Sequence, residues 1–254
     1  MIVLDVTTVV TNYKTLDLVI GVTEGQVGHQ PGGLLGCYPD LPLVLIDNGS
    51  ADRSTQYIEW VTRRYENVSA ILNRLRTDLP DEPPKGMTAQ QWKIRKRIAE
   101  SGNVGHGIAL HQAAMLCKTP YMLALDSDCV ILKCGFVEAM FARLGPGFYA
   151  VGLNVQPKRR KFPVIHPSVM MFDVEAYKTL TPFALAGGPA KENFESAREA
   201  GYTVVDFPAN QYIEHLFHGT RKRLHKIPHI RSKPIWPDEV LPWVRTEYRG
   251  GYFE

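Results

Sequence analysis

Short apolar segments alternate with helical segments through the first half of this 254-residue sequence. Residues 2–10, 43–46, 68–72 and 121–125 are rich in β-branched and other apolar residues, which is typical of buried strands. Helices are predicted over about 15–25, from Ser50 or Asp52 to about residue 65, and from about 107 to 117. This alternation predicts an α/β fold, in which helices on both faces cover a mostly parallel sheet.

The second half of the sequence is less regular. Residues 148–153, 164–172 and 202–207 predict further strands, and residues 194–200 predict a helix. Residues 26–40 are rich in Gly and Pro and are expected to form a loop, whereas 74–98 carry charges and prolines that indicate an exposed insertion. Residues 221–254 are basic and then rich in Pro and Trp. We therefore expect one domain over residues 1–220, with 221–254 as a tail packed on it.

Composition limits the class of protein. A hydrophobic content of 44% supports a packed core, and no apolar run has the length of a bilayer span. Met1 leads into an apolar strand without a basic segment, so no signal peptide is expected. The four cysteines are too few for a disulfide scaffold and are expected to be reduced thiols in a cytoplasmic protein. No feature of the sequence indicates an oligomeric state.

Positive charge is clustered, although the net charge is only +3. The clusters lie at residues 93–97, 158–161 and 221–226. Such clusters are either solvated faces or contact sites for phosphates, which belong to a nucleotide or to a polyanionic partner.

Polar side chains follow three of the predicted strands. Thr11 and Tyr13 follow the first strand, Asp47 follows the second, and Asp126 and Asp128 follow the strand 121–125. Ligands of parallel α/β sheets gather beyond the carboxyl ends of the strands, so these side chains are expected to meet along one edge. Two carboxylates at such an edge can share a divalent ion that also binds phosphate oxygens.

The same segments, in the same order, resemble the GT-A nucleotide-sugar glycosyltransferases, and especially the large family-2 group. The resemblance covers roughly residues 5–220. Its motifs are Thr11-Asn12-Tyr13, the segment 45–52 (LIDNGSAD), Asn103-Val104-Gly105 followed by Ala109 and Ala113, and Leu125-Asp126-Ser127-Asp128. The resemblance implies a Rossmann-like GT-A fold.

The resemblance also implies roles for individual residues. Thr11, Tyr13 and Asp47 are expected to hold the nucleobase. Asn103, Gly105 and Ser127 are expected to line the donor site. Asp126 is expected beside the ribose or the metal, and Asp128 is expected to ligate Mn²⁺ or Mg²⁺. The family often adds a late histidine ligand, for which His215 is the first candidate and His218 the second. Arg221 and the basic residues after it are candidates for the diphosphate, because guanidinium matches phosphate oxygens.

The catalytic base is less clearly marked. Inverting members of the family use a carboxylate at the start of a helix to deprotonate the acceptor hydroxyl. Glu192 occupies that place in the order, but it is followed by Asn193 where the family pattern has Asp. The segment also resembles a Glu-Asn motif of retaining polypeptide N-acetylgalactosaminyltransferases, so the stereochemistry stays open. Glu192 also fits a purely structural role in a helix first turn. His166 and Asp173 are weaker candidates for acceptor contact or base.

Together these features predict a metal-dependent glycosyltransferase of the hexosyltransferase type, with Asp126 and Glu192 as its catalytic carboxylates. The expected donor is a UDP-sugar, with GDP and dTDP sugars as alternatives. The acceptor is a hydroxyl of a glycan, a lipid-linked sugar or a polyanion such as modified DNA. One rival is a nucleotidyltransferase, although the segment 11–14 lacks the glycine-rich loop of that class. Another rival is a non-catalytic module that binds a nucleotide or a glycan.

Overall fold

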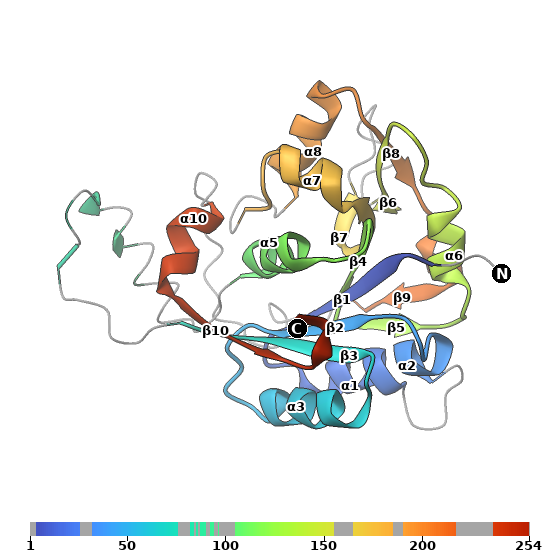
Figure 1. Cartoon of the computed structure of the whole chain (residues 1–254), viewed down its shortest axis with the longest axis horizontal. Coiled ribbons are helices and arrows are strands. Elements are labelled where there is room, and N and C mark those ends of the chain that lie inside the picture. The colour runs from blue at the N-terminus through green and yellow to red at the C-terminus, as the bar shows by residue number, and fades with distance from the viewer. Residues whose placement is uncertain are drawn as a thin grey trace.

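A computed structural model of the chain describes residues 4–25, 32–75, 105–154, 165–184, 190–216 and 236–253, together with 82–83, 85, 87–89, 92–93 and 96. At its centre is an eight-stranded sheet with the order β10-β3-β2-β1-β4-β7-β6-β8 (Figure 1). The strands are β1 (Val6–Asn12), β2 (Leu43–Asp47), β3 (Val68–Leu75), β4 (Tyr121–Asp126), β6 (Phe148–Asn154), β7 (Ile165–Asp173), β8 (Thr203–Asp206) and β10 (Val244–Arg249).

Strand directions confirm a mostly parallel sheet. β3, β2, β1 and β4 are parallel neighbours. β7 runs antiparallel to both β4 and β6, so β6 and its parallel neighbour β8 share the direction of β4. β10 is antiparallel to β3. The sheet therefore combines a parallel half, at which ligands are expected, with a mixed half.

Helices cover both faces of the sheet, as predicted. One hydrophobic core contains residues of α1 (Leu16–Glu24), α2 (Gly33–Cys37), α3 (Ser54–Arg64) and α6 (Phe136–Phe141). The other contains residues of α5 (His106–Leu116), α7 (Val174–Thr179) and α8 (Lys191–Glu199). Adjacent strand residues alternate between the cores: Val10 belongs to the first and Val9 to the second. Figure 1 shows α1, α2 and α3 below the sheet and α5, α7 and α8 above it.

A second, two-stranded sheet lies next to the carboxyl end of β4. β5 (Cys129–Ile131) follows β4 almost at once and pairs antiparallel with β9 (Ile213–His215), so that Cys129 is opposite His215. A short 3₁₀ helix, η1 (Ala209–Gln211), precedes β9. This pairing brings residues near 128 and 215 together despite their separation in sequence.

The last described residues add to the main sheet. After α10 (Pro237–Val240) and η2 (Leu241–Trp243), β10 becomes the edge strand beside β3, and η3 (Gly251–Phe253) follows it. Thr246 of β10 accepts a hydrogen bond from Gln112 (3.1 Å) and donates one to Asn73 (2.9 Å). Asn73 in turn donates to Gln112 (2.7 Å), which closes a buried ring of polar side chains. Part of the segment predicted as a packed tail is thus a strand of the sheet.

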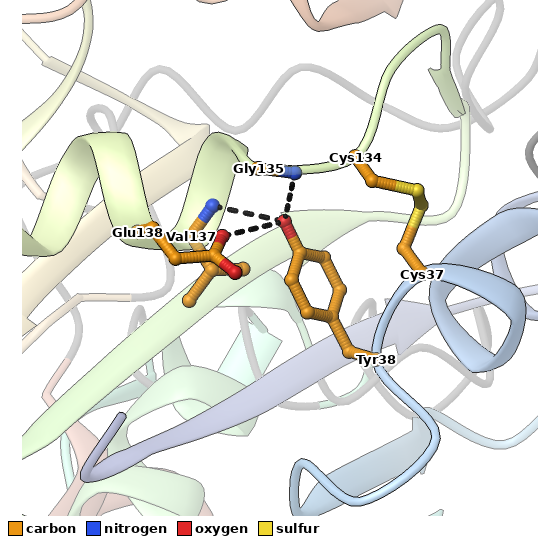
Figure 2. Close-up of a disulfide and its surroundings, with 6 residues drawn as sticks. All are labelled: Cys37, Tyr38, Cys134, Gly135, Val137 and Glu138. Atoms are coloured by element: carbon orange, nitrogen blue, oxygen red, sulfur yellow. Dashed lines mark hydrogen bonds between the residues drawn. A yellow bond between two sulfur atoms is a disulfide. The ribbon is translucent and has the colours of Figure 1, made fainter. Parts of the chain in front are cut away.

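Two of the cysteines contradict the prediction of reduced thiols. Cys37 at the end of α2 and Cys134 before α6 form a disulfide, and their Cα atoms are 5.3 Å apart (Figure 2). The two residues are 97 positions apart in sequence, so their spacing gave no sign of the pairing. Cys117 and Cys129 are free and buried.

The segment 26–40 also differs from the prediction of a loop, because α2 lies within it. Leu34 is buried in the first core, and this burial stabilises a helical turn that the glycine-rich sequence disfavours. Tyr38, directly after α2, is buried as well. Its hydroxyl oxygen accepts hydrogen bonds from the backbone N–H groups of Gly135 (2.8 Å) and Val137 (3.2 Å) and donates to Glu138 (3.1 Å) (Figure 2). The phenol therefore caps the first turn of α6 from a distant part of the chain.

Candidate metal and nucleotide site

The carboxyl ends of three parallel strands carry the polar side chains that the sequence singled out. In the sheet register, Asn12 of β1 is opposite Asp47 of β2, and Thr11 is opposite Asp126 of β4. The predicted convergence of these residues at one edge of the sheet is therefore what the structure shows. Asp128 and Ser127 lie in the turn between β4 and β5.

Asp126, Asp128 and His215 form a group that fits a divalent metal ion. One ligand atom from each lies within 4.8 Å of the other two. Nε2 of His215 is 3.0 Å from Oδ1 of Asp128 and 3.9 Å from Oδ2 of Asp126. Ligands at right angles around an ion with bonds of about 2.1 Å lie roughly 3 Å apart, so these separations suit a shared ion. Two carboxylates and one imidazole are also a donor set that Mn²⁺ accepts.

Asp126 and Asp128 raise the pKa of His215. Burial lowers the pKa of His215, but the hydrogen bond to Asp128 and the negative charges of Asp128 and Asp126 outweigh it, so the pKa is raised above its usual value. Without a metal, the two carboxylates thus favour the protonated form of the imidazole. A metal ion would replace that proton, because only the neutral imidazole can be a ligand.

The pairing of β5 with β9 positions two of these ligands. Besides the Cys129–His215 register, the backbone N–H of Leu216 donates to the carbonyl of Asp128 (3.0 Å). Both side chains are almost fully buried, with exposed fractions of 5% for Asp128 and 7% for His215. The pairing of β5 with β9 therefore fixes Asp128 and His215 relative to each other.

Asp126 is oriented by two further side chains. Its Oδ1 accepts a hydrogen bond from the Thr11 hydroxyl (3.4 Å) and lies 3.1 Å from Nε2 of His106, the first residue of α5. Its Oδ2 is the atom that faces His215. Sequence reasoning missed His106, although it directly follows the Asn103-Val104-Gly105 motif, and that adjacency was the available signal.

Asp47 is held at the end of β2 by a dense set of hydrogen bonds. Its carboxylate accepts from the hydroxyl and the backbone N–H of Ser50, from Thr55 (2.7 Å) and from Nδ2 of Asn12 (3.3 Å). Burial raises the pKa of Asp47, and these hydrogen bonds act in the opposite direction. The residue links β1, β2 and α3, and its role in holding a nucleobase stays a prediction.

The predicted donor-site residues Ser127, Tyr13 and Gly105 surround the same edge. The hydroxyls of Ser127 and Thr15 are 2.9 Å apart, and Thr15 donates to Oδ1 of Asn12 (2.7 Å). Thr15 is the N-cap residue of α1, but its side chain makes these contacts instead of capping the helix. Tyr13 is buried beneath the Lys14 ammonium group (4.9 Å to the ring centre). Gly105, the N-cap residue directly before α5, has φ +96°, a conformation that favours glycine.

His166 is a further histidine of this region. It lies in β7, and the centre of its ring is 5.5 Å from that of His215. Burial lowers the pKa of His166; Asp126 opposes this shift, and His106 adds to it. Three imidazoles thus surround the paired carboxylates of Asp126 and Asp128.

Among the described residues, no hydrogen bond or ion pair joins Glu192 or Asp173 to the metal-site residues, in contrast to His166, whose ring lies beside that of His215. Glu192 lies in the first turn of α8, 3.8 Å from Lys191, and no contact joins it to the metal-site group within the described ranges. Asn193 is fully buried, accepting from Tyr149 and donating to the carbonyl of Thr181. Asp173 caps α7 by accepting from the N–H of Ala176 (2.8 Å).

Three other predicted residues lie outside the described residues: Asn103, Arg221 and His218. The basic clusters at 158–161 and 221–226 also lie there, as does most of the 74–98 insertion. In the part of the chain that the structure describes, no helix is long and apolar enough to cross a membrane.

The architecture and the acidic edge site define the class: the chain has the GT-A fold of nucleotide-sugar glycosyltransferases. A mannosyltransferase from Pyrobaculum calidifontis, solved in complex with GDP-Man and Mn²⁺, superposes with a TM-score of 0.57 at 16% identity over 94% of this chain and 67% of that one. S. aureus TarS residues 1–349 superpose with a TM-score of 0.50 at 12% identity over 82% of this chain and 59% of that one. No protein-family model and no curated protein matches the sequence.

The chain is shorter than these structural neighbours. It spans 59% of the TarS fragment and 36% of a longer TarS structure, which superposes with a TM-score of 0.51. At identities of 12 to 16%, the likeness establishes the fold. The family-2 assignment and the roles of individual residues stay predictions.

Proposed function

We propose that this protein is a divalent-metal-dependent glycosyltransferase that moves a sugar from a nucleoside diphosphate to a hydroxyl group. One observation carries the proposal: Asp126, Asp128 and His215 place three ligand atoms within 4.8 Å at the ligand-binding edge of a GT-A sheet. The mannosyltransferase neighbour with the same fold was solved with a nucleotide sugar and Mn²⁺, which supports the assignment.

The proposed chemistry divides between the ion and the side chains. A bound Mn²⁺ or Mg²⁺ supplies positive charge that neutralises the diphosphate as it leaves the sugar. Asp126, Asp128 and His215 would hold the ion, and Thr11 and His106, which lie against Asp126, would keep its carboxylate in place. Because these ligands are preorganised by strand pairing, little reorganisation is needed when the donor binds.

For the donor, we propose a uridine diphosphate sugar. Tyr13 and Asp47 lie at adjacent strand ends, and an aromatic ring with a carboxylate suits the stacking face and N–H of uracil. The four hydrogen bonds on Asp47 mean that a base N–H would share or displace one of them. The Pyrobaculum neighbour was solved with GDP-Man, so guanosine donors belong in the same test.

For the acceptor side, we propose Glu192 as the group that receives the hydroxyl proton. Its Oε2 is buried and has no hydrogen-bond partner among the described residues. A buried carboxylate oxygen is costly without a partner, and an acceptor hydroxyl would supply one. The basic clusters of the sequence support a polyanionic acceptor, whose use should fall steeply as salt is raised.

The decisive experiment measures Mn²⁺-dependent turnover of UDP-, GDP- and dTDP-sugars, including slow hydrolysis in the absence of acceptor. We expect turnover with one donor and its loss, together with Mn²⁺ binding, in Asp128→Asn. The control is Asp40→Asn, which changes an exposed carboxylate in the turn before β2, at the other end of that strand from Asp47. Turnover that persists in Asp128→Asn would contradict the proposal.

The same experiment separates the rivals. A non-catalytic module would bind a nucleotide or glycan without turning over any donor, and its binding would survive chelation of the metal. A nucleotidyltransferase would release pyrophosphate from a nucleoside triphosphate and leave nucleotide sugars intact.

A further inference from the structure

His166 is positioned beside the metal-site residues by the pairing of β4 with β7. In that antiparallel ladder, Leu125 is opposite Val169, so the residues just before Val169 pass alongside the turn that carries Asp126 and Asp128. The buried thiol of Cys129 donates to the carbonyl of Ser168 (3.3 Å), which ties β7 to the start of β5. The His166 ring therefore has a fixed place next to His215.

The hydrogen bonds of His166 define which ring nitrogen carries the proton. The backbone N–H of Ser168 donates to Nδ1 of His166 (3.3 Å), and a backbone N–H can only donate. Nδ1 is therefore the nitrogen without a proton. The Ser168 hydroxyl, 2.7 Å from the same atom, completes this arrangement as a second donor. The proton of the neutral ring is then on Nε2, since the partner of one nitrogen selects the tautomer of the other.

We propose that Nε2–H of His166 donates a hydrogen bond to a diphosphate oxygen of the sugar donor. The proposal rests on the proposed function, because Asp126, Asp128 and His215 define where a metal-bound diphosphate would lie. It assigns His166 to donor binding and not to the acceptor. It also excludes Nε2 of this residue as a base, because a nitrogen that already carries a proton cannot accept the one leaving a hydroxyl, and Nδ1 is engaged by Ser168.

His106 and His166 would then have different tasks at the same carboxylates. Nε2 of His106 lies 3.1 Å from Asp126, so this imidazole acts on a metal ligand. His166 has its Nδ1 engaged by Ser168 of its own strand, so Nε2 is the ring nitrogen that remains for a ligand. A donor N–H at this point complements the negative charge that grows on the departing diphosphate.

The test compares nucleoside diphosphate with nucleoside monophosphate binding in the presence of Mn²⁺. The probes are UDP and UMP, or GDP and GMP if the wild type prefers guanosine, measured by calorimetry. A hydrogen bond to a charged acceptor predicts a roughly 10- to 100-fold loss of diphosphate affinity in His166→Ala, with monophosphate affinity unchanged. His166→Gln, which can present an N–H at a similar place, should recover part of the loss.

Equal losses for both nucleotides, or no loss for either, would overturn the inference while leaving the proposed function intact. If the wild type binds neither diphosphate with Mn²⁺, the proposed function fails as well. A second measurement does not depend on a variant: ¹⁵N NMR of the wild-type imidazoles should show His166 as the Nε2–H tautomer. A proton found on Nδ1 would equally overturn the assignment.

Discussion

At the scale of single residues, the protonation of His215 links the site to pH. Asp128 and Asp126 raise the pKa of this imidazole in the folded, metal-free protein. A raised pKa means that the folded state binds the proton more tightly than the unfolded state does. The resulting stabilisation is complete below the ordinary histidine pKa of about 6.5 and is lost as pH rises through the higher, folded value.

We therefore expect metal-free wild type to lose its stability advantage over His215→Gln as pH rises from mildly acidic to alkaline. The free energies of unfolding of both proteins, measured by urea denaturation across that range, provide the check. An advantage that stays constant or grows with pH would show that the His215–Asp128 pair does not set this pKa.

The site residues that belong to a local sequence motif could be predicted from the sequence. Asp126 and Asp128 follow a strand, and the order of motifs then pointed to His215. Sequence reasoning missed His106 because no pattern requires a histidine after Gly105, and its contact with Asp126 arises only when α5 packs beside β4. It also missed the pairing of Cys37 with Cys134, because that contact depends on tertiary packing.

At the scale of elements, α6 depends on a side chain from outside its own segment. The hydroxyl of Tyr38 accepts from two N–H groups at the start of α6 and donates to Glu138. Tyr38→Phe would leave these groups without that partner, so we expect a loss of about 1–3 kcal/mol in the free energy of unfolding. Tyr248→Phe, on the exposed edge strand, is the matched control and should stay within about 0.5 kcal/mol.

The disulfide next to Tyr38 joins α2 to the start of α6. It closes a loop with a sequence separation of 97, for which loop entropy predicts a stabilisation of about 4–5 kcal/mol. The double variant Cys37→Ser/Cys134→Ser should show this loss in urea denaturation of the oxidised proteins. Wild type measured with reductant should match the variant. A variant as stable as the oxidised wild type would mean that the bond adds no constraint to the unfolded chain.

Elements with strong periodicity were predictable, and those stabilised by distant partners were not. β1, β2 and β4 are apolar runs, and α3 and α5 follow clear helix signals. α2 is short and glycine-rich, and it exists because Leu34 packs into the core. β10 carries exposed charged and polar residues, so its sequence predicts an exposed tail. It forms a strand because it pairs with the free edge of β3.

At the scale of the whole molecule, we expect ligand binding to raise the free energy of unfolding. A ligand at a hundred times its dissociation constant adds about 2.7 kcal/mol to the free energy of unfolding. For a chain of this size that corresponds to a rise of roughly 5–10 °C in Tm. We expect Mn²⁺ together with the matching nucleoside diphosphate to produce such a rise in calorimetry, and Asp128→Asn to abolish it. A rise that is equal without Mn²⁺ would contradict metal-dependent binding.

The fold class could be predicted because strands and helices alternate through the first half of the chain, which supplies the parallel strands β1 to β4. The antiparallel direction of β7 in the mixed half of the sheet could not be predicted. A strand's direction follows from how the chain connects it to its neighbours and not from its composition. The disulfide also bears on the predicted cytoplasmic location, because such bonds persist mainly in oxidising compartments.

The edge position of β10 has a consequence for synthesis on the ribosome. β3 emerges early, whereas its antiparallel neighbour is translated only after nearly all of the remaining strands. During that interval the backbone N–H and C=O groups on the outer edge of β3 are unpaired and can form hydrogen bonds with another extended peptide. We therefore expect the outer edge of β3 to be a site of aggregation in the nascent chain until β10 is translated and covers it.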